Sequence, residues 1–324
     1  MKLNFVIGIG RSGTTLLSML LDKQDQTQSL HDIPFIPFFY KTLRNTRKLS
    51  QRDHELLTSY FSNFTNDSET IIKIQNEIPK IDSVSSYSDL IEKLFNIITT
   101  KKNTIQFFDK EPSYTLHVDL LVKLFPKAKF IYMVRDPRAN FLSRKENPNN
   151  RTTNIYFNCY RWKFHNKEGI KAIKKYPDKI KTIRYEDLVE APEKVLHDIS
   201  KFIGFKINSE TFSEPIIHFE KIMVDTDINP TFYKNHKHKL SKEINKDRLD
   251  SWEFNLTGEE IAICDAICFN EASFFGYEKS TTNIRTPKNS TQQFIKAKYD
   301  IYKEYILTHI SASRKLKRIK RLKQ

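Results

Sequence analysis

A glycine-rich stretch near the start of the chain has the residue types of an anion-binding loop. Residues 8–15 read GIGRSGTT, which is the phosphate-binding pattern G-x-x-x-x-G-K-[ST] with Thr14 in place of the lysine. Backbone amides of such a turn at a helix N-terminus bind anions whatever the side chains. Without the lysine, a nucleoside triphosphate is a poor ligand. A smaller oxyanion held by Arg11, Thr14 and Thr15 without a metal fits better, although a degenerate triphosphate loop or a helix-capping turn stays open.

A second stretch of the sequence adds another arginine to the candidate anion-binding site. In KFIYMVRDPRANFLS, Arg135 follows an apolar run directly, and Ser143 comes eight residues later on the helix that begins at Pro137. Ligands of open α/β sheets bind at the carboxyl ends of the strands. We therefore expect Arg135 to face the same crevice as the glycine-rich loop, which gives that crevice two anion-binding positions.

Several motifs together resemble the sulfotransferases that use 3′-phosphoadenosine 5′-phosphosulfate. They occur in that family's order from about Phe5 to Tyr277, which is far more specific than a lone loop. The matching segments are GIGRSGTTLLSMLLD, DKEPSY, LFPKAKFIYMVRDPRANFLS, IRYEDLVEAPEKVLHDISKFIGF, and WEFNLTGEE followed by FFGY.

The resemblance implies a P-loop-like three-layer α/β/α fold and a set of nucleotide-binding residues. It assigns the 3′-phosphate to Arg135 and Ser143, and it puts Tyr185 beside the adenine. A basic late loop should close over the nucleotide, with Lys234, Lys237 and Arg248 as candidates, but that segment departs from the Arg-Lys-Gly pattern of the cytosolic enzymes. The loop residues expected to hold the 5′-phosphosulfate are Arg11, Ser12, Gly13, Thr14 and Thr15.

Sulfuryl transfer, by analogy with phosphoryl transfer, needs positioning and electrostatic stabilisation. Arg11 and Thr14 can serve the sulfuryl oxygens. Lys110 follows a predicted strand in FDKEP and can neutralise the leaving group, although a solvated lysine at a strand end is the alternative. For the base, alignment with tyrosylprotein and carbohydrate sulfotransferases selects Asp32, where those enzymes have glutamate, although a capping or turn role for Asp32 stays open. His31, with an ordinary pKa near 6.5, is the rival base.

A β-sheet is needed to position these residues, and the sequence has the hydrophobic pattern of one. Apolar runs over 3–9, 104–108, 129–134 and 180–184 alternate with helical segments, which is typical of a doubly wound parallel sheet. Aromatic and polar segments over about 34–102 predict a helical insert, whose aromatics either line the acceptor site or belong to the core. We expect one domain over 1–290, followed over 291–324 by a terminal helix with a basic tail.

The composition limits the partners and the compartment. Fifty-four lysines and arginines against 39 acids give a formal charge of +15, which favours an anionic partner. The three cysteines have no metal-ligand spacing, so buried reduced thiols are expected. The first strand leaves no room for a signal peptide and no segment is long and apolar enough for a membrane span, so a cytoplasmic protein that needs no metal is expected.

Other functions remain open from the sequence. A small-molecule kinase is the main alternative enzyme, and Thr14 argues against it. The absence of an interleaved aromatic and basic pattern outside the tail argues against nucleic-acid binding. The tail suits peripheral contact with an anionic membrane, and a solvated terminus is the alternative. The acceptor is some hydroxyl, with a weak preference for a carbohydrate or glycolipid over a tyrosine, phenol or sterol. The oligomeric state is not determined.

Overall fold

In the part of the chain that the structure describes, five parallel strands form a central sheet in the order β2-β3-β1-β4-β5. The structure is a computed structural model that describes residues 2–31, 34–62, 68–99, 101, 103–147, 152–208, 249–280 and 290–308. Registers pair Phe5 of β1 with Asp109 of β3 and with Phe130 of β4. The strands are β1 (Lys2–Gly8), β2 (Thr27–His31), β3 (Gln106–Lys110), β4 (Phe130–Val134) and β5 (Ile180–Arg184).

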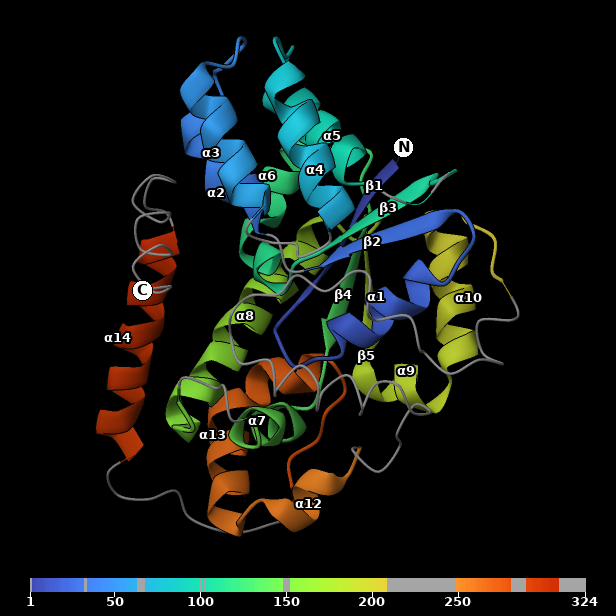
Figure 1. Cartoon of the computed structure of the whole chain (residues 1–324). Helices are drawn as coiled ribbons and strands as arrows, with labels where there is room; N and C mark the ends of the chain where they lie inside the picture. Colours follow the sequence, from blue (N-terminus) through green and yellow to red (C-terminus); the bar gives the residue numbers. More distant parts are fainter. Residues whose placement is uncertain are drawn as a thin grey trace.

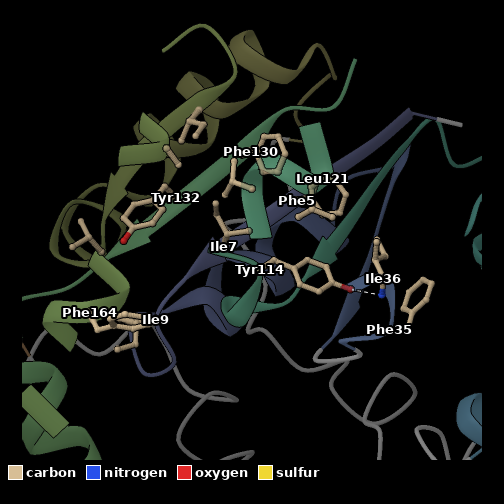
Figure 2. Close-up of a cluster of buried hydrophobic side chains, with 14 of the residues drawn as sticks. Phe5, Ile7, Ile9, Phe35, Ile36, Tyr114, Leu121, Phe130, Tyr132 and Phe164 are labelled. Atoms are coloured by element: carbon tan, nitrogen blue, oxygen red, sulfur yellow. Dashed lines mark hydrogen bonds between the residues drawn. The ribbon is translucent and has the colours of Figure 1, made fainter. Parts of the chain in front are cut away.

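Alternate residues of β1 enter two separate cores, which explains its continuous apolar sequence. Phe5 and Ile7 lie in the larger cluster, where the Phe5 ring stacks on Phe130 at 5.1 Å (Figure 2), and Val6 lies in the smaller cluster on the other face. A strand covered on both faces has no solvent side, so it needs no polar alternation. The expected α/β sheet of parallel strands is confirmed.

Helices cover both faces of this sheet (Figure 1). The smaller core packs α1 (Thr14–Asp22), α9 (Tyr185–Glu190) and α10 (Pro192–Ile203) on one face. The larger core packs the other face against η2 (Pro112–His117), α6 (Val118–Leu124), α8 (Ile155–Lys175) and α13 (Gly258–Phe274), with α14 (Ser290–Thr308) lying on α8. Short helices α7 (Pro137–Lys145) and α12 (Ser251–Asn255) complete this side.

The segment between β2 and β3, where an insert is predicted, contains four α-helices and one 3₁₀ helix among the described residues. Phe35 and Phe39 are buried in its core, and the Tyr114 hydroxyl on η2 accepts a hydrogen bond from the Ile36 amide at 3.2 Å (Figure 2). Of the two uses expected for the insert's aromatics, Phe35 and Phe39 therefore belong to the core. The insert contains α2 (Phe35–Leu43), α3 (Gln51–Ser62), α4 (Ser68–Glu77), η1 (Ile78–Lys80) and α5 (Tyr87–Ile98).

Strand β2 is the main element that sequence patterns did not predict. Its sequence, TQSLH, has one aliphatic residue, and within the described residues it pairs only with β3, at the edge of the sheet. An edge strand with few apolar residues gives no periodic signal, because its place depends on pairing. The strand predicted at 104–108 runs instead over Gln106–Lys110, which makes Lys110 its last residue.

Two further expectations concern the cysteines and the membrane. Cys159, Cys264 and Cys268 are free, buried thiols between α8 and α13, and burial raises the pKa of all three. Within the described parts of the chain, no helix is both long and apolar enough to cross a membrane.

Candidate active site at the carboxyl edge of the sheet

The glycine-rich loop turns sharply between β1 and α1. Arg11 has a φ of 74° and Gly13 a φ of 84°, and this left-handed conformation at two nearby positions folds the loop back over the start of α1. Gly13 is the N-cap of α1 and supplies no capping side chain. The first amides of α1 therefore keep the anion-binding capacity expected from the sequence.

Side chains of helix α7 donate hydrogen bonds to the glycine-rich loop. Asn140 Nδ2 donates to the Gly10 carbonyl and to Ser12 Oγ, both at 3.2 Å, and a guanidinium nitrogen of Arg144 donates to the same Gly10 carbonyl at 2.7 Å. Asn140 also accepts from Arg144 Nε at 3.1 Å. Sequence reasoning missed these two residues, although their spacing of four on the helix that carries Ser143 places them on one face.

The loop and the Arg135 segment meet directly. Arg11 Nε donates to Ser143 Oγ at 3.0 Å, and Arg135 donates to the Arg11 carbonyl at 3.4 Å. The Arg135 guanidinium also lies 4.1 Å from the centre of the Tyr185 ring, which is a cation–π contact. The two predicted anion-binding segments are therefore in direct contact.

The Tyr185 ring packs against the backbone of the loop. A Cβ placed on Gly13 would lie 2.4 Å from Cδ2 of the Tyr185 ring, so only glycine allows this approach. Tyr185 begins α9 directly after β5, at the carboxyl edge where β1 also ends. Its ring is therefore fixed between the Gly13 backbone and the Arg135 guanidinium.

Lys110 reaches the loop from the neighbouring strand. It ends β3, its side chain is 1% exposed, and its Nζ lies 3.4 Å from Thr15 Oγ1 as a hydrogen-bond donor. In the β2–β3 register His31 is paired with Lys110, so the chain leaves β2 one strand spacing from this lysine, about 5 Å. The alternative of a solvated strand-end lysine is wrong because Lys110 is buried.

A partly buried carboxylate, that of Glu186, stabilises the turn that follows Arg135. Glu186 accepts hydrogen bonds from the Asp136 amide at 3.1 Å and from the Tyr277 hydroxyl at 2.7 Å. Burial raises the pKa of Glu186 above its ordinary value. Trp162 Nε1 donates to the Arg135 carbonyl at 3.0 Å, so Arg135 extends from a backbone that is held on two sides.

The family model for sulfotransferases matches residues 5–209, more than half of the chain. The chain belongs to the sulfotransferase family. It is 23% identical over 271 residues to protein-tyrosine sulfotransferase 2 of Gallus gallus, covering 80% of this chain and 65% of that protein. The chain spans less than two thirds of the length of several curated relatives that it matches.

Solved sulfotransferase domains share the fold. One comes from the curacin biosynthetic pathway (TM-score 0.61, 20% identity, 86% of this chain and 99% of that one) and another from the Synechococcus PCC 7002 olefin synthase (TM-score 0.59, 22% identity, 86% and 95%). The predicted P-loop-like three-layer fold is therefore confirmed.

The donor set of this candidate site fits an anionic nucleotide with a phosphosulfate. Arg11, Arg135 and Lys110 supply positive charge, and Ser143 and Thr15 supply hydroxyls within hydrogen-bond reach of those cations. Arginine forks suit tetrahedral oxyanions without a metal. Within the described ranges, no group of three His, Cys, Asp or Glu side chains is arranged to hold a metal ion.

Some predicted residues cannot be placed in this geometry. Asp32 lies outside the described residues, as do the late-loop candidates Lys234, Lys237 and Arg248. The backbone of His31 is described as the end of β2. The choice of base and the identity of the closing loop stay predictions.

Proposed function

We propose that this protein transfers a sulfuryl group from 3′-phosphoadenosine 5′-phosphosulfate to a hydroxyl acceptor. The observation that carries the proposal is the meeting of Arg11, Ser143 and Arg135 beside a phosphate-type loop that lacks its lysine. Two cations at that position suit a ligand with two separate anionic groups, which a nucleoside triphosphate with magnesium does not require. Membership of the sulfotransferase family supports the same activity.

Each side chain then has a role in holding the nucleotide. Arg135 and Ser143 bind the 3′-phosphate, and the α1 amides with Ser12, Gly13, Thr14 and Thr15 bind the 5′ end. Tyr185 lies against the Arg135 guanidinium and presents a ring for stacking on the adenine. When bound, the phosphosulfate supplies the sulfuryl group for in-line transfer.

The transfer itself depends on charges fixed at the loop. Lys110 Nζ, held beside Thr15 Oγ1, is placed to neutralise negative charge at the 5′ phosphate. Arg11 and Thr14 stabilise the oxygens that carry charge in the transition state. We assign proton removal from the acceptor to Asp32, with His31 as the rival, because the chain emerges from β2 next to Lys110.

The acceptor of the sulfuryl group is a hydroxyl whose class is assigned from two sources. The sequence favoured a carbohydrate or glycolipid hydroxyl, but the chicken relative is named a protein-tyrosine sulfotransferase. A tyrosine hydroxyl of a protein therefore fits at least as well and is the first acceptor to test. Phenols and sterols remain further candidates, and burial of Phe35 and Phe39 removes two aromatics from the acceptor pocket.

Thermal stability tests the nucleotide part of this proposal. The protein is melted in EDTA with adenosine 3′,5′-bisphosphate, and in parallel with ATP and Mg²⁺. A ligand at about 100 times its Kd stabilises by about 2.7 kcal/mol. Stabilisation by the bisphosphate alone supports sulfuryl transfer, whereas stabilisation by ATP with Mg²⁺ alone would favour the kinase alternative.

Product analysis tests the acceptor. The protein and the phosphosulfate donor are incubated with an acidic tyrosyl peptide, an oligosaccharide, a glycolipid and a small phenol. Mass spectrometry identifies the sulfate ester that forms. Sulfation of the peptide alone supports the tyrosine assignment, and sulfation of a sugar hydroxyl alone restores the carbohydrate assignment.

A further inference from the structure

Helix α14 has one apolar face that packs on the body of the protein. Ala297 and Ile301 are buried against α8, and Phe294 contacts the Tyr160 ring edge-on with 5.2 Å between centroids. Tyr305 similarly contacts Phe164 at 5.7 Å. This face accounts for the attachment of the helix at the edge of the molecule, outside α8 (Figure 1).

The same helix has a second apolar face that points to solvent. We call it the outer stripe: Ile295, Tyr299, Tyr302 and Ile306, which are 61%, 64%, 42% and 64% exposed. Tyr302 lies at its margin, where one edge of its ring also contacts Phe164 with 5.4 Å between centroids. Their spacing of four, three and four residues puts them within an arc of about 60° when each residue turns the helix by about 100°. Half of the eight large apolar side chains found exposed in the described parts of the chain lie in this stripe, so it is a patch and not a scatter.

Lysines border the outer stripe on both sides. By the same helical geometry, exposed Lys296 and Lys303 lie along one edge and exposed Lys298 along the other. Asp300 falls on a different side of the helix, beyond the Lys296 edge. Long lysine stems that flank an apolar stripe can cover it while their charges reach an aqueous boundary.

We propose that the outer stripe of α14 binds the surface of an anionic lipid bilayer. An apolar stripe edged by lysines is the pattern of a helix that lies in a membrane interface, and tyrosine suits that boundary because its ring is apolar and its hydroxyl polar. The sequence that follows α14 has the matching charge. Between residues 311 and 324 it carries no acid and seven cations: Arg314, Lys315, Lys317, Arg318, Lys320, Arg321 and Lys323.

Charge favours the bilayer over a second copy of the chain. Pairing two outer stripes would bring the edge lysines of both copies together and would set two basic tails on one assembly. Anionic lipid instead attracts each lysine and arginine near its surface. The inference concerns where the protein binds and does not depend on the reaction that it catalyses.

Vesicle co-sedimentation of the full chain tests the proposal. We expect the protein to pellet with vesicles of phosphatidylcholine and phosphatidylserine in a three-to-one mixture, and much less with phosphatidylcholine alone. Ile295→Gln/Ile306→Gln removes the two aliphatic members of the stripe and should lower the partition coefficient about tenfold. The matched control is Phe254→Gln, because Phe254 is 86% exposed on α12, and it should bind as the wild type does.

A second pair of variants separates local charge from net charge. Lys296→Gln/Lys298→Gln/Lys303→Gln should weaken binding severalfold, whereas Lys127→Gln/Lys194→Gln/Lys201→Gln, which loses the same charge at exposed positions elsewhere, should not. The proposal fails if the stripe variant binds as tightly as the wild type while deletion of residues 309–324 abolishes binding. It also fails if sedimentation velocity shows a dimer that the stripe variant dissociates.

Discussion

The Nε of Arg11 donates a hydrogen bond of 3.0 Å to the hydroxyl of Ser143, which lies 132 residues later in the chain. Arg11 belongs to the glycine-rich loop and Ser143 to α7, so this one bond joins the two predicted anion-binding segments. The carbonyl of Arg11 also accepts from Arg135. The affinity of one segment for a ligand should therefore depend on residues of the other segment.

A double-mutant cycle measures this link. Arg11→Ala and Ser143→Ala should each weaken binding of adenosine 3′,5′-bisphosphate, with a coupling energy of about 0.5–1.5 kcal/mol, the usual contribution of one hydrogen bond. Calorimetric titration gives the affinities. Pairing Arg11→Ala with Ser273→Ala, an exposed serine on α13, should give additive effects, and additivity of the Arg11/Ser143 pair would contradict the link.

Arg135→Ala should remove most of the stabilisation by the bisphosphate. Loss of charged hydrogen bonds to a phosphate costs about 2 kcal/mol, or roughly a thirtyfold weaker Kd. The thermal shift at a fixed ligand concentration reports this loss. Arg47→Ala, at an exposed arginine in the helical insert, should keep the full shift, and an equal loss in both variants would mean that only net charge matters.

Gly13→Ala tests the contact with Tyr185. Gly204 has a φ of 90° with no atom within 4 Å of the place a Cβ would occupy, whereas Gly13 has a φ of 84° and the Tyr185 ring 2.4 Å away. Gly204→Ala should therefore cost about 1–2 kcal/mol of unfolding free energy from backbone strain alone. Gly13→Ala should cost more and should weaken bisphosphate binding. Denaturant unfolding compares the two, and equal costs would mean that the ring yields without penalty.

Lys110→Met should impair turnover more than nucleotide binding. Methionine fills the buried volume but removes the charge beside Thr15, so we expect kcat to fall by about 100-fold, the usual loss for one electrostatic group at a reacting centre. Bisphosphate affinity should change far less. Lys181→Met, at a half-buried lysine on β5, is the control and should retain its kcat. A matched fall in both variants would remove Lys110 from the transfer step.

Acidification should destabilise the protein through His165 on α8. Burial, helped by the charges of Arg161 and Arg144, holds the pKa of His165 well below its ordinary value of 6.5. As pH falls below 6.5, the unfolded chain binds a proton that the folded chain does not, so unfolding free energy declines by up to about 1.4 kcal/mol per pH unit. Above pH 6.5 the histidine is neutral in both states, so it does not lower the unfolding free energy there.

Denaturant unfolding at pH 7 and pH 5 detects this loss. His165→Gln cannot take up the proton in either state, so its stability should change less between the two values than that of the wild type. His197→Gln, at an exposed histidine of α10, should keep the wild-type dependence. The same slope in the His165 variant would show that other groups cause the acid sensitivity.

Local sequence patterns were enough to specify most of the sheet, the loop and the order of the anion-binding segments. Strands β1, β4 and β5 lie close to their predicted bounds, and helices α1, α8 and α10 occur where helical segments are expected to alternate with the strands. Each is specified locally, since strands covered on both faces are continuously apolar and helices repeat every 3.6 residues. The glycine-rich loop motif and the spacing between Arg135 and Ser143 can likewise be recognised within one short segment of the sequence.

Which distant residues meet was settled by tertiary packing alone. Strand β2 has too few apolar residues to be recognised alone and exists through pairing with β3. Asn140 and Arg144 donate hydrogen bonds to the carbonyl of Gly10. Phe35 and Phe39 are buried in the core. These outcomes depend on packing between segments far apart in the chain, and periodicity within one segment carries no information about which segment will lie against it.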